Sequence, residues 1–285
     1  TGVYISDLAA WCRISFDYSN NPLQIAKNLY LHDRLVTNLL VPAGITSISD
    51  YAFYGCTSIT SVTLPDGLTA IGKNAFQNCT NLQSITMPAG VQSIGSSAFY
   101  GCASLASMVM PDSISTVGAN AFQDCTALKR VVLSKGLTEL ATSAFSGCTG
   151  LISVQIPENV TTIGQYAFYD CDNLRIIRFC GNAPETLRDL DPTDTVIICF
   201  YPANNPTWTD ELLDTARLPY NVWFASKDPL SEHPTENDTS GYCGRVAYWA
   251  VKDGVLTISG SGEMANYDYE GMPWYSLYES IEAVV

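Results

Sequence analysis

Few side chains in this sequence have the types and spacing that catalysis requires. The chain of 285 residues holds two histidines, His32 and His233, and neither accompanies a serine or cysteine nucleophile motif. A catalytic triad or a histidine-centred metal site therefore has no support, and we interpret both as surface histidines. The Gly260-Ser261-Gly262 stretch lacks the Lys-Ser/Thr that completes a phosphate-binding loop. We predict that the chain is not an enzyme and uses no cofactor.

A group of aspartates is the sequence feature best suited to a metal ion: Asp189, Asp191 and Asp194. An EF-hand loop starting at Asp189 would need glycine at its sixth position and glutamate at its twelfth. This chain has Asp194 and Phe200 at those places. We therefore favour a solvated acidic loop over a calcium site.

Cysteines are frequent, and six of the ten recur at a constant spacing: Cys56, Cys79, Cys102, Cys125, Cys148 and Cys171. Each would have equal neighbours on both sides in a stack of coils, so we predict buried, reduced thiols that pack as small apolar groups. Cys180 and Cys199 lie on consecutive predicted strands, and a disulfide between them stays open. Close cysteine pairs typical of zinc sites are missing from the sequence.

Composition limits the partners that the chain can bind. The net charge is −14 at neutral pH, whereas nucleic acid and anionic membranes require basic surfaces. The sequence has no apolar run near the ~20 residues that span a bilayer. We therefore expect neither nucleic-acid binding nor membrane insertion.

A repeat of 23 residues must position whatever binding groups the chain has. Six phenylalanines follow an alanine and precede a cysteine by three positions: Phe53, Phe76, Phe99, Phe122, Phe145 and Phe168. Self-similarity at such a period is typical of a solenoid, in which each coil buries its apolar face only against its neighbours. We interpret the phenylalanines as a stacked core.

Each coil is predicted to contain a short strand, a corner, a short extended piece and a helical turn. In the coil that starts at Val62, Val62 and Leu64 alternate with Thr63, which indicates a strand. Pro65 then ends the strand, and the Ala-Phe-Cys spacing of three and four suits one or two helical turns. The fold class is therefore an α/β solenoid of short parallel strands and short helical turns, followed by the β-rich start of a second module.

The strand positions that face away from this core form the candidate binding surface. Solenoids commonly bind partners on such continuous faces. The side chains on the predicted face are small and weakly polar in the first coils and become basic in the later coils. Basic side chains suit a carboxylate-rich or sulfated partner. The candidate binding residues are Thr63, Thr86, Lys129, Arg130, Gln155, Arg175 and Arg178. Scattered solubilising charge is the alternative interpretation.

The repeats resemble the BspA-like, or Treponema pallidum-type, leucine-rich repeats. Their motif IPxxVxxIGxxAFxxCxxL matches LPDGLTAIGKNAFQNCTNL, MPAGVQSIGSSAFYGCASL and IPENVTTIGQYAFYDCDNL in this chain. The resemblance implies a surface-displayed bacterial protein, often multi-modular, with adhesion to host matrix proteins or cells in some members.

These patterns divide the chain into five predicted parts. They are a degenerate leading coil (1–38), six repeats (39–176), a closing coil and C-terminal cap (177–225), a polar linker (226–241), and a cap hairpin with the first strand of a second repeat module (242–285). The sequence starts at Thr1 rather than methionine and stops within a strand pattern. We expect a fragment of a longer protein.

The leading hypothesis is a non-enzymatic, extracellular or cell-surface adhesion module that works as a monomer. Its partner would be a host matrix or cell-surface protein or glycan. A rigid stalk that displays another domain is the second hypothesis. Carbohydrate binding is the third, for which tyrosines beside the Ala-Phe step would supply platforms: Tyr51, Tyr54, Tyr100, Tyr166 and Tyr169.

Overall fold

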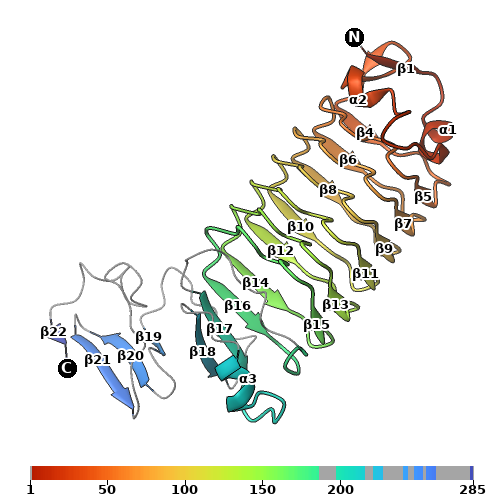
Figure 1. Ribbon diagram of the computed structural model, residues 1–285. Helices are drawn as coiled ribbons and strands as arrows, with labels where there is room; N and C mark the ends of the chain where they lie inside the picture. Colours follow the sequence, from red (N-terminus) through yellow and green to blue (C-terminus); the bar gives the residue numbers. More distant parts are fainter. Residues whose placement is uncertain are drawn as a thin grey trace.

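Stacked coils form an elongated solenoid that runs from a small N-terminal cap to a C-terminal β-rich segment (Figure 1). Successive coils repeat the same path, so their strands line up in two rows along the stack. This computed structural model describes residues 2–185, 197–215, 221–226, 240–242, 247–252, 255–260 and 283–284.

The N-terminal cap combines strands with two short helices. Helix α1 (Leu8–Arg13) starts after Asp7, whose carboxylate accepts a hydrogen bond from the Ala10 N–H at 2.9 Å. The Trp11 indole is buried and donates to the Ala52 carbonyl at 2.8 Å, which fixes the helix against the first coil. The other cap elements are β1 (Val3–Ile5), α2 (Leu23–Ala26), β2 (Leu29–Leu31) and β3 (Arg34–Leu35).

Two rows of parallel strands carry the repeats. The first row contains β4 (Asn38–Leu40), β6 (Ser61–Thr63), β8 (Ser84–Thr86), β10 (Ser107–Val109), β12 (Arg130–Val132), β14 (Ser153–Ile156) and β16 (Ile176–Phe179). The second contains β5 (Ser47–Ile48), β7 (Ala70–Ile71), β9 (Ser93–Ile94), β11 (Thr116–Val117), β13 (Glu139–Leu140) and β15 (Thr162–Ile163). Val62 pairs with Leu39 on one side and Ile85 on the other, so the register equals the sequence period.

The predicted phenylalanine core is confirmed. The six rings have no exposed surface, and neighbouring ring centroids lie 5.2–5.8 Å apart with nearly parallel planes. Aromatic pairs at such separations add stability beyond the apolar area that they bury. The stack therefore joins each coil to the next through one continuous line of rings.

The Ala-Phe segment forms turns rather than the predicted helical turns. Backbone φ is positive at Tyr51 and again at Gly55, and the equivalent positions repeat this in the following coils. Left-handed residues interrupt an α-helix, so the backbone hydrogen-bonds to the next coil instead. The Phe53 N–H, for example, donates to the Ala75 carbonyl at 2.8 Å.

The repeat cysteines are buried free thiols, as predicted. The Cys79 thiol donates to the Phe53 carbonyl at 3.1 Å, and the four cysteines that follow do the same one coil later each time. Cys180 and Cys199 are also free thiols. Cys199 pairs with Ile177 and lies in the core, whereas Cys180 follows β16 and is only partly buried.

The predicted closing coil continues the first strand row. Strands β17 (Ile197–Pro202) and β18 (Asn221–Ser226) add to it in parallel, with α3 (Asp210–Thr215) between them. The Trp208 ring lies 4.9 Å from Phe179 and covers that end of the core.

Beyond this coil, the predicted hairpin is present as antiparallel β20 (Ala247–Lys252) and β21 (Val255–Gly260). Strand β19 (Ser240–Tyr242) pairs with β20, and β22 (Ala283–Val284) pairs with β21 in parallel. Several sequence predictions lie outside the described residues: the aspartate cluster, His233, and nearly all of the linker.

Candidate interaction surface

The exposed side of the first strand row is the candidate surface, and we call it the outer sheet face. Its main column projects from the third position of the strands: Leu40, Thr63, Thr86, Val109, Val132 and Gln155. Leu40 is 68% exposed, Val109 58% and Val132 37%. An uncharged, partly apolar column therefore runs along five coils and ends at a polar residue.

A second column on the same face consists mainly of serines. It contains Asn38, Ser61, Ser84, Ser107, Arg130 and Ser153, which pair in register within β4–β6–β8 and within β10–β12–β14. The Ser61 hydroxyl donates to the Asn38 side chain at 2.8 Å. Arg130 is therefore the first charged side chain that either column presents.

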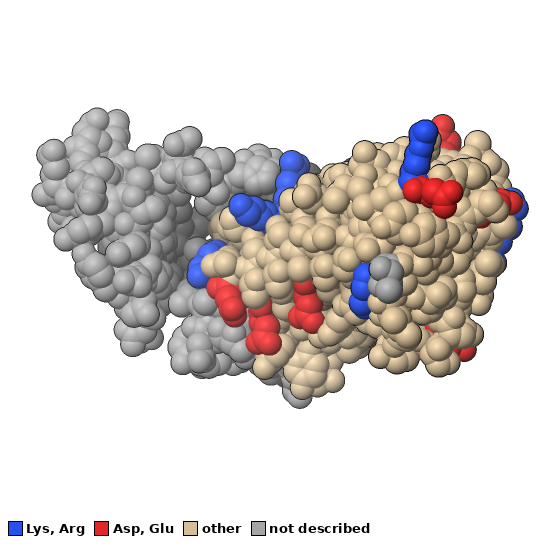
Figure 2. Space-filling model, turned by 90° about the horizontal axis from the view of Figure 1, so that it is seen from above, with Lys and Arg blue, Asp and Glu red and all other residues tan. Residues whose placement is uncertain are grey.

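Charge is unevenly distributed over the described array. On the side that Figure 2 shows, most basic side chains lie toward the two ends, and the stretch between them is mainly uncharged. A line of acidic side chains follows one border of this stretch. The chain as a whole carries 28 acidic and 14 basic residues, so a basic group on the surface departs from its average.

Six of the seven predicted binding residues are exposed. Thr63, Thr86, Arg130 and Gln155 lie on the outer sheet face itself. Lys129 directly precedes β12 at the rim of this face. Arg175 lies in the turn before β16, where its guanidinium donates to the Asp172 and Leu174 carbonyls at 2.7 and 3.2 Å. Arg175 is therefore partly occupied by its own turn.

The predicted exposure of Arg178 is wrong. Arg178 is only 4% exposed, and its guanidinium carbon lies 4.3 Å from the centre of the Phe200 ring. Strand β17 pairs with β16 and places Phe200 directly beside Arg178. The guanidinium therefore stacks on an aromatic face inside the closing coil, where it stabilises that coil instead of facing a partner.

A hollow of about 670 Å³ opens where the outer sheet face becomes charged. Its lining includes Val132 and Gln155 from the outer sheet face, and its charged lining groups are Arg130, Lys135 and Glu158. The remaining lining residues are Val131, Leu133, Ser153, Pro157, Cys180 and Pro202. The hollow thus combines apolar side chains with two cations and one carboxylate.

Sequence reasoning missed Lys135 and Glu158. Both belong to the corner column that follows the strands, which reads Asp66, Ala89, Asp112, Lys135 and Glu158. Lys135 is the only cation in that column. Reading the corner column together with the strand columns would have placed Lys135 next to Arg130.

The Cys180 thiol in the hollow is not activated as a nucleophile. The Gln155 amide donates to the Cys180 sulfur at 3.0 Å. Burial raises the pKa of Cys180, so the thiol stays protonated at neutral pH. Within the described ranges, no group of three or more His, Cys, Asp or Glu side chains could hold a metal ion. The lining is suited to binding by shape and charge.

The parallel register of 23 residues, the buried strand column and the turn-borne phenylalanine stack define a leucine-rich repeat solenoid. The sequence profile of the BspA type leucine rich repeat region matches six copies, over residues 23–105 and 69–188. These ranges together cover more than half of the chain, which belongs to this family.

Solved structures from several bacteria match parts of this chain. A leucine-rich repeat protein from Bacteroides ovatus is 25% identical, with a TM-score of 0.46, over 60% of this chain and 50% of that one. A Treponema pallidum leucine-rich repeat protein is 29% identical, with a TM-score of 0.39, over 49% and 78%. A leucine-rich cell-surface protein from Faecalibacterium prausnitzii is 30% identical, with a TM-score of 0.34, over 51% and 54%.

The matched part therefore spans half of the Bacteroides ovatus protein. The search of curated proteins found no match. In the part of the chain that the structure describes, none of the helices has the length and apolar character to cross a membrane.

Proposed function

We propose that this chain is a non-enzymatic interaction module, displayed at a bacterial cell surface, that binds a macromolecule on its outer sheet face. The observation that carries the proposal is the hollow over β12 and β14, where the uncharged column meets Arg130 and Lys135. Extended concave or flat faces of this kind are the usual binding surfaces of solenoid proteins.

The lining indicates the chemistry of the partner. Arg130 and Lys135 can bind carboxylate or sulfate groups, and Arg130 can do so with two parallel hydrogen bonds. Val132 and Val109 offer apolar contact area on the neighbouring strands. An extended acidic or sulfated macromolecule, such as a matrix protein segment or a sulfated glycan chain, would match this basic hollow and the apolar stretch beside it.

The test is equilibrium binding of the whole chain to immobilised fibronectin, fibrinogen, collagen, mucin and sulfated glycans. The variant Arg130→Glu/Lys135→Glu reverses both cations in the hollow. Lys27→Glu/Lys73→Glu provides a control with the same charge change, because Lys27 follows α2 in the N-terminal cap and Lys73 lies in an Ala-Phe turn, so neither belongs to the outer sheet face. We expect saturable binding that weakens at least about tenfold in the hollow variant and far less in the control.

Equal weakening in both double variants would refute a specific role for the hollow, since overall charge would then explain the effect. Binding to none of the five ligands would favour the rigid-stalk hypothesis instead. Binding that the hollow variant leaves unchanged would place the binding site elsewhere.

Exposed tyrosines favour glycan recognition as a second candidate. Tyr166 is 47% exposed and Tyr169 39%, and their rings form an edge-to-face pair at 5.4 Å on the last Ala-Phe turn. Exposed aromatic rings supply apolar contact area with a polar tip. For this candidate, Tyr166→Ala/Tyr169→Ala would abolish glycan binding while the hollow variant would retain it.

A further inference from the structure

Strand β4 has an open edge at the N-terminal end of the first strand row. The Ser61 N–H donates to the Thr37 carbonyl, and the Val41 N–H donates to the Thr63 carbonyl. The backbone groups of Thr37 and Val41, at the two ends of β4, therefore face β6. Alternate residues of a parallel strand direct their backbone groups to opposite edges. The N–H and C=O groups of Asn38 and Leu40 therefore point away from β6, toward an edge where no described strand pairs with β4.

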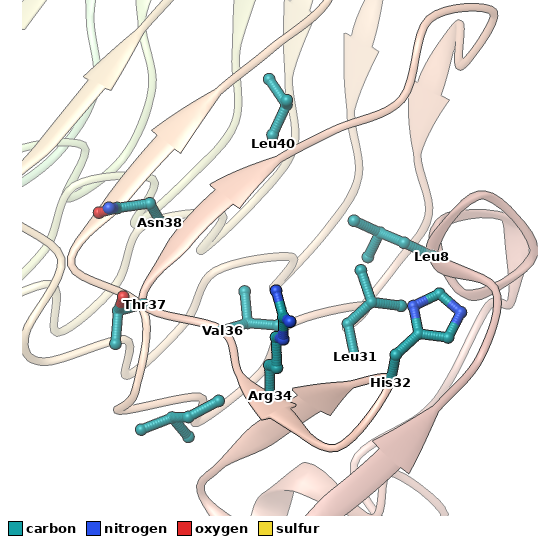
Figure 3. Close-up of a pocket in the computed structure, with 9 residues that line it drawn as sticks. Leu8, Leu31, His32, Arg34, Val36, Thr37, Asn38 and Leu40 are labelled. Carbon is teal, nitrogen blue, oxygen red and sulfur yellow. The ribbon is translucent and has the colours of Figure 1, made fainter.

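A hollow of about 570 Å³ borders this open edge (Figure 3). Asn38 and Leu40 lie on its β4 side, and Leu8, Leu31 and His32 lie across from them on the cap. Its volume is typical of sites that take small ligands or short peptide segments. Leu40 is 68% exposed and Leu35 44%, so two large apolar side chains remain available for contact.

The hollow has one positive charge at its rim. Arg34 is the charged residue of its lining, although the chain carries twice as many acidic as basic residues. Arg34 is held by the β2–β3 hairpin, in which it pairs with Leu31 across a two-residue turn. The turn residues, His32 and Asp33, have φ of 48° and 62°, the left-handed conformation of a tight hairpin turn. The Arg34 guanidinium is therefore fixed beside the open edge.

We propose that the edge of β4 takes up an extended acidic peptide from a partner protein as an additional strand. The peptide backbone would bond to the free groups of Asn38 and Leu40, as in other cases of β-strand addition. Its apolar side chains would contact Leu35 and Leu40, and a carboxylate would lie beside Arg34. This site is separate from the charged hollow over β12 and β14 and does not depend on the proposed function.

The test uses the full chain and a fluorescent peptide, acetyl-Asp-Val-Thr-Val-Asp-amide, in anisotropy titrations. We expect saturable binding with a Kd of roughly 10–500 μM, as for short peptides at one edge. The variant Leu40→Pro removes the backbone donor at an edge position that does not bond to β6, and proline is tolerated at sheet edges. Leu40→Ala is the matched control, because it shortens the side chain and keeps the N–H group.

We expect Leu40→Pro to weaken binding at least about tenfold and Leu40→Ala to weaken it less. The same peptide with N-methylated valines cannot donate those hydrogen bonds and should not bind, which tests strand addition without altering the protein. Arg34→Glu should weaken binding, and exchange of both aspartates for lysine should weaken it in the native chain.

Three results would overturn the proposal. The first is an absence of saturable binding up to roughly 1 mM peptide, which corresponds to the weakest binding that would count as specific in this titration. The second is equal affinity of the N-methylated peptide or of folded Leu40→Pro. The third is a concentration-dependent dimer in sedimentation that Leu40→Pro dissociates, because this would assign the edge to a second copy of the chain.

Discussion

Replacing one ring of the phenylalanine stack tests how the coils hold together. Phe122 has no exposed surface, and its ring centroid lies 5.3 Å from that of Phe99 and 5.3 Å from that of Phe145. Phe122→Ala should lower the free energy of unfolding by about 3–5 kcal/mol, the usual cost of removing a buried phenylalanine. The loss includes two aromatic pairs at about 0.5–1.5 kcal/mol each.

Phe168→Ala is the matched control, because Phe168 is equally buried but closes the stack with one described ring neighbour, Phe145 at 5.8 Å. We expect Phe122→Ala to cost about 0.5–1.5 kcal/mol more than Phe168→Ala, the value of the second pair. Urea unfolding followed by far-ultraviolet circular dichroism gives both values. A cost below about 1 kcal/mol for Phe122→Ala, or a larger cost for Phe168→Ala, would refute a stack that couples neighbouring coils.

The remaining predictions concern close backbone contacts and buried thiols. A Cβ on Gly118 would lie 2.7 Å from the Cα of Ser96 in the preceding coil, so Gly118→Ala should destabilise by about 1–3 kcal/mol, measured by thermal unfolding. Gly67→Ala meets nothing within 4 Å and should stay within about 0.5 kcal/mol of the native chain. Burial raises the pKa of Cys12 and Cys171 from 9.0 to about 12, so between these values the unfolded chain loses protons that the folded chain keeps. Stability should therefore fall as pH rises from 9 toward 12, and Cys171→Ala should flatten the fall in urea midpoints measured across that range. An unchanged slope in this variant would contradict the role assigned to the thiol.

The repeat period predicted the solenoid, its core and its thiols because each depends on contacts between equivalent positions. Once Phe76 occurs 23 residues after Phe53, stacking follows from the need of each coil to bury its apolar face. The same repeat predicted that Cys79 lies in the core, because every coil has its cysteine at the same position.

The course of the backbone at the Ala-Phe step was harder to predict from residue types. Apolar spacings of three and four suggest helix, but Asn74 and Asn78 adopt positive φ and end any helical run. Asparagine and glycine occupy these two positions in some coils, but tyrosine, serine or aspartate occupies them in others. The left-handed positions are therefore not obvious from residue types. The hydrogen bonds to the next coil that replace helical ones are visible only in the folded chain.

Arg178 was misplaced because its neighbour comes from outside the repeats. The register that sets Phe200 beside Arg178 depends on β17, which follows a segment with no repeat signature. The charged hollow was found only in part for a related reason. Arg130 and Gln155 are strand positions, whereas Lys135 and Glu158 approach them from the corners.

Hydroxyl-radical footprinting would show whether the partner binds on the outer sheet face. The whole chain would be oxidised with and without a saturating amount of whichever ligand binds, and modified residues would be located by mass spectrometry. Val109 and Val132 report on the face, while Tyr166 and Tyr169 report on the Ala-Phe turns; all four side chains are exposed. We predict protection of the two valines with the tyrosines unchanged. Protection of the tyrosines with the valines unchanged would contradict binding on the outer sheet face.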